Sequence, residues 1–282
     1  MIKITTHPGK FHLDDVTACA LVRIEHEDKA SIIRRSRKPE DWDWADIVLD
    51  VSEQYDGRGY FDHHQEDVPV YENGIKYSAV GLYLKHMTKL SEEEKTYLLE
   101  HGLFAVQAQD NGQSLRELEL SYPNPFSFVD TYNCDWKTGV YGPEQDNAFR
   151  HAVELAYQVI MNLLRDARLD KLAREQLDKV LSEYRLESHF ADIGDYCPWL
   201  ERMIAYNDGV PDIRAVIFKS SNGQYSVQVV PKREDSTEAW CEIPDVSDLP
   251  GFVFRHKFKF IAGFTEYKSA VTAAKRTVEN LR

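Results

Sequence analysis

The stretch Tyr60-Phe61-Asp62-His63-His64-Gln65 places three metal-competent side chains in a row. The aromatic pair before them is typical of the end of a buried strand. Neutral imidazoles and ionised carboxylates suit a transition metal such as Mn²⁺ or Zn²⁺ better than Ca²⁺. Adjacent histidines also occur in many surface turns, so the stretch predicts a metal site only in combination with other ligand-rich segments.

Length and composition describe a globular protein with room for two domains. The chain has 282 residues, of which 43% are hydrophobic and 29% are charged. No window approaches 18 uninterrupted apolar residues, so we expect no transmembrane helix. The first residues show no signal-peptide pattern. The four cysteines are scattered without a Cys-x-x-Cys pair, which favours a reducing compartment, and we expect the cytoplasm.

The net charge of −13 argues against a protein that coats long duplex DNA, because such binding depends on neutralising phosphates. It does not exclude nucleic acid, since a carboxylate cluster that holds divalent metal increases the negative count and bound ions would offset part of it. Two segments, 29–38 and 255–282, are locally basic. Each is more typical of a solvated face than of a binding site.

The N-terminal segment predicts a strand over 2–6, a turn, and a helix from Val16 onward. The turn contains His7, His12, Asp14 and Asp15 within nine residues. We expect Asp14 or Asp15 to cap the helix. In an open α/β sheet this turn lies at the carboxyl edge of the strands, where ligands bind.

Two further carboxylates follow apolar runs. The run 45–51 has the pattern of a buried parallel strand, and it brings Asp50 to the same sheet edge. The run 104–109 ends at Asp110, just before Asn111-Gly112. An ordinary turn is the alternative for each, but the neighbouring ligand-rich turns favour metal binding.

The remaining patterns complete an α/β prediction, with a doubly wound, mainly parallel sheet in the N-terminal domain and a smaller α+β C-terminal domain. We place the domains at 1–190 and 191–282. Other expected elements are a strand at 31–34, a helix over 77–86 with Ser78 near its cap, a helix opened by the capping box at Ser91, one helix or two in succession between 148 and 189, a hairpin of 213–218 with 225–230, strands at 252–254 and 258–261, and a helix from Thr265 to Leu281.

The candidate ligands come from four loops at one expected sheet edge. They are His7, His12, Asp14, Asp50, Asp62, His63, His64 and Asp110. This number exceeds the needs of one four-coordinate zinc ion, and two divalent ions about 3.5–4 Å apart that share a carboxylate fit it better. Such sites hydrolyse phosphoesters or phosphoanhydrides. The sequence has no Walker lysine motif and no Gly-x-Ser-x-Gly motif, which agrees with this class.

The sequence resembles the DHH phosphoesterase superfamily and, within it, the MYG1 family (UPF0160). The resemblance rests on Thr6-His7-Pro8-Gly9-Lys10-Phe11-His12-Leu13-Asp14-Asp15, Asp46-Ile47-Val48-Leu49-Asp50-Val51, Tyr60-Phe61-Asp62-His63-His64-Gln65 and Asp110-Asn111-Gly112. Weaker similarities extend over nearly the whole chain.

The resemblance implies a Mn²⁺- or Mg²⁺-dependent active site with two ions that share Asp50. It assigns His7, His12 and Asp50 to one ion, and Asp14, Asp50, His63 and Asp110 to the other. It also implies that His64 faces the substrate phosphate and that Asp62 orients the neighbouring histidine. The first superfamily motif has an aspartate where this chain offers His12, with one extra residue after His7.

The resemblance further implies a phosphodiesterase, with 3′-to-5′ exonuclease action on RNA or short oligonucleotides. A small-molecule phosphohydrolase and a non-catalytic metal-binding regulator are the alternatives. In the C-terminal domain, Ala262-Gly263-Phe264 lacks the basic residue typical of the superfamily's substrate site. We therefore expect Lys232 and Arg233 to bind substrate, with Lys257 and Lys259 as alternatives. We expect a homodimer, an expectation that no particular residue supports.

Overall fold

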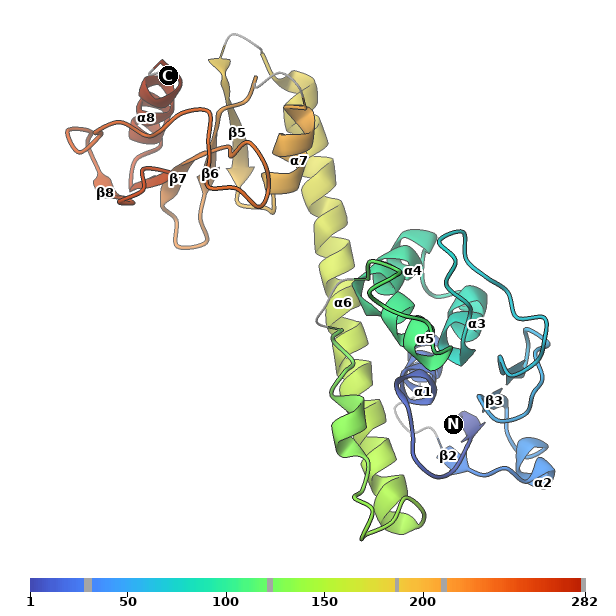
Figure 1. Ribbon diagram of the computed structural model, residues 1–282. Helices are drawn as coiled ribbons and strands as arrows, with labels where there is room; N and C mark the ends of the chain where they lie inside the picture. The colour runs from blue at the N-terminus through green and yellow to red at the C-terminus, as the bar shows by residue number, and fades with distance from the viewer. Residues whose placement is uncertain (28–31, 121–123, 186–187, 209–211, 280–282) are drawn as a thin grey trace. The chain divides into compact units, whose positions relative to one another are not determined.

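A computed structural model describes residues 1–27, 32–120, 124–185, 188–208 and 212–279. The chain forms two compact units, Met1–Arg168 and Leu169–Arg282, and each is described by itself (Figure 1). The boundary lies inside a long helix and not near residue 190, where we expected it. The reason is packing, because Ala173 and Leu177 of this helix are buried in the same cluster as Ala191 and Ile193 of the second unit.

Unit 1 contains a sheet of four parallel strands: β1 (Lys3–Thr6), β2 (Ile32–Arg35), β3 (Ile47–Leu49) and β4 (Tyr60–Phe61). Their order in the sheet is β2-β1-β3-β4. The chain leaves β1 toward β2 on one side and returns to β3 on the other, so the strand order reverses at β1. In doubly wound sheets the crevice at this reversal, beyond the carboxyl ends of the strands, is the usual ligand site.

Helices and turns complete unit 1. They are α1 (Leu13–Glu25), α2 (Pro39–Trp42), α3 (Ala79–His86), α4 (Glu92–Leu98), the π-helix η1 (Leu99–Leu103), α5 (Phe104–Asp110), the 3₁₀ helix η2 (Val129–Tyr132) and the part of α6 (Pro143–Glu183) up to Arg168. Helix α1 is buried from Leu13 to Arg23, as expected for a helix surrounded by other elements. It shares the core with residues of α3 and α6 such as Leu82, Val153 and Ile160.

Local signals set the starts of the helices. Ser78 is the N-cap of α3, and Ser91 and Glu94 form the capping box of α4, both as predicted. The prediction for α1 was wrong, because the N-cap is His12 and both aspartates lie in the first turn. The run between 148 and 189 forms one continuous helix of 41 residues, α6, which begins before and ends within the expected range.

Unit 2 is an α+β unit that begins with the C-terminal part of α6, from Leu169 onward. Its elements are β5 (Phe190–Asp195), α7 (Leu200–Tyr206), β6 (Ala215–Lys219), β7 (Tyr225–Val229), β8 (Phe252–Arg255), β9 (Ile261–Phe264) and α8 (Tyr267–Glu279). The sheet order is β5-β6-β7-β9-β8, parallel between β5 and β6 and antiparallel elsewhere. Side chains of α8, including Ala270 and Ala274, are buried in one cluster with Val227 and Ala262 of the sheet.

The β6–β7 hairpin is confirmed, with Gly223 at a φ of 83° in its turn. The strand expected at 258–261 was misplaced. Lys259 has a φ of 59° and its N–H donates to the His256 carbonyl, so these residues form the turn before β9. The predicted strand residue Ser31 and the helix end at Leu281 lie outside the described residues. None of the described helices combines the length and apolar character needed to cross a bilayer.

Candidate metal centre

His7 follows β1 directly and is buried, with 5% of its surface exposed. Its Nδ1 lies 3.1 Å from the Pro8 carbonyl oxygen, which can only accept a hydrogen bond. Nδ1 therefore carries the proton, and the unprotonated Nε2 keeps a lone pair that can bind a metal ion. Burial lowers the pKa of His7 to about 4, so the ring is neutral at physiological pH. A neutral imidazole with one fixed N–H is the form that binds metal.

Asp50 follows β3 and occupies the left-handed backbone region, with a φ of 55°. Aspartate tolerates this conformation better than most residues do, and such outliers cluster at functional sites. Its Oδ2 lies 3.6 Å from His7 Nε2. The side chain is buried, and its Oδ1 has no hydrogen-bond partner among the described residues. Burial and then the charge of Asp14 raise the pKa of Asp50 well above its usual value.

Asp14 lies in the first turn of α1 and is fully buried. Its carboxylate accepts the backbone N–H groups of Ala79 and Val80, each at 2.9 Å, and the hydroxyl of Ser78. These donors form the N-terminus of α3, where the helix dipole stabilises a negative charge. Burial and the nearby Asp110 nevertheless raise the pKa of Asp14 to about 6.

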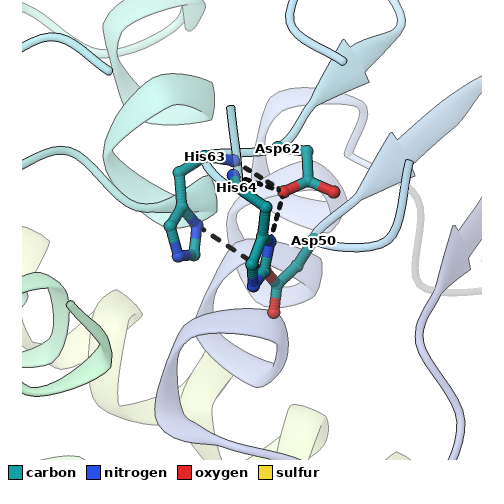
Figure 2. A group of neighbouring side chains, drawn as sticks. All are labelled: Asp50, Asp62, His63 and His64. Atoms are coloured by element: carbon teal, nitrogen blue, oxygen red, sulfur yellow. Dashed lines mark hydrogen bonds and ion pairs between the residues drawn. The ribbon is translucent and has the colours of Figure 1, made fainter. Parts of the chain in front are cut away.

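Asp62, which follows β4, uses its carboxylate to organise the two histidines beside it (Figure 2). Oδ1 accepts the N–H groups of His63 at 2.7 Å and His64 at 3.1 Å, and it lies 2.6 Å from His64 Nδ1. Oδ2 accepts the N–H of Glu53 at 2.8 Å. Burial alone would raise the pKa of Asp62, but the hydrogen bond from His64 and the backbone donors lower it, so this carboxylate remains ionised.

His63 and His64 stack with 4.5 Å between their ring centroids, and the Nδ1 atom of each lies 3.6 Å from Asp50 Oδ1 (Figure 2). His63 is buried, and its Nε2 lies 3.0 Å from Asp110 Oδ2 at the end of α5. Burial opposes protonation of His63, but the bond to Asp110 and the charge of Asp14 raise its pKa overall. The His64 side chain is 56% exposed.

The structure brings all six sequence-predicted metal positions together as two overlapping sets. In each set, one ligand atom per residue lies within 4.8 Å of every other. The sets are His7, His12 and Asp50, and Asp14, Asp50, His63 and Asp110. They share Asp50, the residue expected to bridge two ions. His12 is the most exposed member, with a side chain 52% accessible and Nδ1 at 3.9 Å from Asp110 Oδ1.

A third grouping joins Asp50, Asp62, His63 and His64. The Asp62 oxygens, however, already accept four hydrogen bonds, one of them from the His64 ring.

Several buried atoms fit divalent cations and have no hydrogen-bond partner in the described part of the chain. They are His7 Nε2, Asp15 Oδ2, Asp50 Oδ1 and His63 Nδ1. Unpaired buried groups of this kind are costly, and a cation that they coordinate removes the cost. The mixed imidazole and carboxylate donors suit Mn²⁺ and related ions better than Ca²⁺.

Asp15 is buried. The sequence offered it as one of four possible ligands in its turn and as a possible helix cap, but the expected two-ion assignment did not include it. Its Oδ1 accepts the N–H of His12 at 2.9 Å, and its Oδ2 lies 3.2 Å from His7 Nε2. Its place in this ligand-rich turn was the signal, but aspartate is also a common residue at helix starts, so the sequence did not separate the two roles.

The two residues predicted to bind substrate, Lys232 and Arg233, lie in unit 2. Lys232 Nζ is 3.6 Å from a Glu238 oxygen and 5.0 Å from the Trp240 ring centroid. Arg233 Nε is 3.7 Å from an Asp235 oxygen. Both cations therefore have acidic partners on their own loop. The aromatic residues Phe264 and Trp199 of unit 2 are buried in its core.

Comparison with known proteins gives the family. The model of MYG1_exonuc, described as the uncharacterised protein family UPF0160, matches residues 3–278. This chain belongs to the MYG1 family. The expected family membership is thereby confirmed.

Relatives in the MYG1 family match almost the full chain. The "MYG1 exonuclease" of Homo sapiens is 29% identical, over 98% of this chain and 85% of its own length. The MYG1 protein of Saccharomyces cerevisiae is 26% identical, over 98% and 95%. Among solved structures, RecJ in complex with Mn²⁺ from Thermus thermophilus aligns with a TM-score of 0.34 and 15% identity, over 98% of this chain and 51% of that chain.

Proposed function

We propose that this protein is a divalent-metal-dependent phosphodiesterase that uses two ions and shortens RNA or short oligonucleotides from the 3′ end. The observation that carries the proposal is the pair of donor sets that share Asp50 at the strand-order reversal of a parallel sheet. Two-ion sites with a shared carboxylate serve in-line displacement at phosphorus. The name exonuclease given to the human MYG1 relative supports the same class.

We assign His7, His12 and Asp50 to one ion, and Asp14, Asp50, His63 and Asp110 to the other. Mn²⁺ is the ion that we propose, with Mg²⁺ as the alternative. When bound, such ions stabilise negative charge on the phosphoryl oxygens and lower the pKa of an attacking water. Two sets of hydrogen bonds hold these side chains in place. The Pro8 carbonyl accepts the Nδ1–H of His7, and the backbone N–H groups at the N-terminus of α3 donate to the Asp14 carboxylate.

His64 is the group that we propose to face the substrate phosphate. Asp62 fixes its Nδ1–H, which leaves Nε2 for another partner. The hydrogen bond to Asp62 raises the pKa of His64, so a larger fraction of the rings is cationic near neutral pH. A cation held at this position would bind a phosphoryl oxygen, with the small reorganisation cost typical of preorganised sites.

A small-molecule phosphohydrolase is the second candidate, and one observation favours it. The cavity beside the ligand sets has a volume of about 350 Å³, which is near the lower end of small-molecule sites. Such a cavity accommodates pyrophosphate or a single nucleotide without a long binding groove.

The test is turnover of a short RNA, labelled at either the 3′ or the 5′ end, beside pyrophosphate, with Mn²⁺ present and Asp50→Asn as the control. We expect a ladder of shortened products that the variant does not form, and the two labels report the direction of digestion. Phosphate release from pyrophosphate with intact RNA would favour the second candidate. No turnover of either substrate by protein that demonstrably binds Mn²⁺ would contradict an enzymatic role on both.

A further inference from the structure

The cavity beside the metal-binding side chains has a wall that the proposed catalytic groups do not use. Its lining residues include the exposed side chains of Lys10, Arg37 and Tyr141 together with His7 and Asp50. All of these residues lie in unit 1. The cavity lining therefore combines two basic side chains and an aromatic ring with carboxylates such as that of Asp50.

Lys10 and Arg37 reach the cavity from the segments that follow two adjacent strands. Lys10 lies in the loop after β1, and Arg37 follows the end of β2 by two residues. Neither cation forms an ion pair with any other described residue, in contrast to Arg35, whose guanidinium lies 3.1 Å from an Asp146 oxygen. Two uncompensated cations beside a cavity in a chain of net charge −13 indicate an anionic ligand.

Hydrogen bonds to a backbone carbonyl fix the loop that carries Lys10. The Gly9 carbonyl accepts hydrogen bonds from Arg35 Nη2 at 2.6 Å and from Gln145 Nε2 at 3.0 Å. The Arg35 side chain is only 2% exposed, so this anchor is part of the packed core. Lys10 therefore projects from a fixed support, which lowers the entropy cost of binding a ligand.

Tyr141 supplies the aromatic part of the wall. It is 72% exposed, yet its ring lies close against the loop at Gly9. A Cβ at Gly9 would lie 3.3 Å from Tyr141 Oη, and Gly9 also has a φ of 92°, a conformation that favours glycine. A side chain at residue 9 would therefore displace the ring. Because the ring is exposed and lines the cavity, it offers a stacking surface for a planar group.

We propose that Lys10, Arg37 and Tyr141 form a nucleotide subsite beside the metal centre. The two cations bind a phosphate next to the one that reacts, or a terminal phosphate, and Tyr141 stacks on the base. The inference rests on the proposed function and deepens it, because a site that reads a base selects nucleotides over pyrophosphate. The groups that recognise the substrate are then contributed by unit 1, whereas the sequence led us to expect Lys232 and Arg233.

Equilibrium binding tests the subsite without turnover. The full chain with Mn²⁺ is titrated by calorimetry with two probes that resist hydrolysis, adenosine 5′-methylenephosphonate and methylenediphosphonate. Lys10→Gln and Arg37→Gln are each expected to weaken binding of the adenosine probe about tenfold, since each removes one charge-assisted contact. Tyr141→Leu is expected to weaken binding of the adenosine probe about five- to tenfold and to leave binding of methylenediphosphonate unchanged. Tyr141→Phe keeps an aromatic ring and is expected to bind the adenosine probe as the wild type does.

Matched controls are Lys38→Gln, an exposed lysine next to Arg37, and Trp136→Leu, an aromatic side chain that is 85% exposed and outside the cavity. Both should bind the adenosine probe as the wild type does. Equal binding by the wild type and the three cavity variants, or no binding of the adenosine probe at all, overturns the subsite.

A second comparison uses a short RNA with and without a terminal phosphate. If the Arg37→Gln variant binds both RNAs with the same affinity while the wild type prefers one, the subsite binds the terminal phosphate. If the variant loses the same factor in affinity for both RNAs, the subsite binds an internal phosphate. A protein that binds the adenosine probe through these residues but cleaves no RNA refutes the proposed function and leaves the subsite supported.

Discussion

Replacing Asp50 with asparagine should stabilise the metal-free protein and remove its response to Mn²⁺. Asn keeps the size of the side chain and tolerates the left-handed backbone, so the fold at the end of β3 should persist. The substitution removes one buried negative charge from a group that also contains Asp14 and Asp110. The sign of the stability change is therefore opposite to that of most substitutions of buried residues.

The magnitude follows from the separation of the carboxylates. Ligand oxygens in this set lie within 4.8 Å of one another, and two full charges at that distance repel by roughly 3.5 kcal/mol with an effective dielectric constant of about 20. Because burial and the neighbouring charges raise the pKa of Asp50, a bound proton relieves part of this repulsion. We expect a net stabilisation of about 2 kcal/mol, or a rise in Tm of about 4–8 °C.

The assay is thermal unfolding in EDTA and in Mn²⁺, with hydrogen exchange of α1 and β3 peptides to restrict the measurement to unit 1. At an Mn²⁺ concentration of about a hundred times Kd, the free energy of unfolding of the wild-type protein should rise by about 2.7 kcal/mol for each bound ion. This corresponds to a rise in Tm of about 5–11 °C for each ion. Mn²⁺ should leave the Tm of the Asp50→Asn protein almost unchanged. Asp43→Asn, a control at an exposed site, should show the same Tm rise with Mn²⁺ as the wild type. A lower metal-free Tm in Asp50→Asn, or a full Mn²⁺ response, would refute the reasoning.

Three further predictions concern neighbouring residues. Asp62→Asn should lower kcat at least tenfold with unchanged Mn²⁺ stoichiometry, because only the orientation of His64 is lost; loss of a bound ion would show that Asp62 is a ligand. The affinity for Mn²⁺ should rise about tenfold from pH 5 to pH 7, because the proton on Asp14, whose pKa is about 6, competes with the ion and is lost as the pH rises. An affinity that calorimetry finds independent of pH over this range contradicts the prediction. Ser78→Ala should reduce stability to urea by about 2 kcal/mol, since the buried Asp14 carboxylate loses a hydroxyl donor, and no change in the midpoint would argue against that bond.

The sequence could predict most of the arrangement of the candidate site because several of its side chains directly follow buried strands. His7, Asp50 and Asp62 come immediately or almost immediately after β1, β3 and β4, and parallel strands bring their carboxyl ends to one edge. The N-cap at Ser78 was also visible, because a short polar side chain before an apolar helix is a strong local signal. In these cases the local pattern and the tertiary structure agree.

Other features depend on tertiary contacts that no local pattern encodes. Lys10, Arg37 and Tyr141 meet at one cavity only because β2 pairs with β1 and the segment before α6 returns to the loop at Gly9. The misplaced strand has a different cause. Phe258 and Phe260 alternate with lysines as strand residues do, but Lys259 adopts a left-handed turn and leaves Phe258 70% exposed.

The most direct test of the two-ion site is a crystal structure of Mn²⁺-soaked protein with anomalous scattering recorded at the manganese edge. We predict two anomalous peaks about 3.5–4 Å apart, both in contact with the Asp50 carboxylate, with His7 at one and His63 at the other. A single peak, or peaks that do not contact Asp50, would contradict the account.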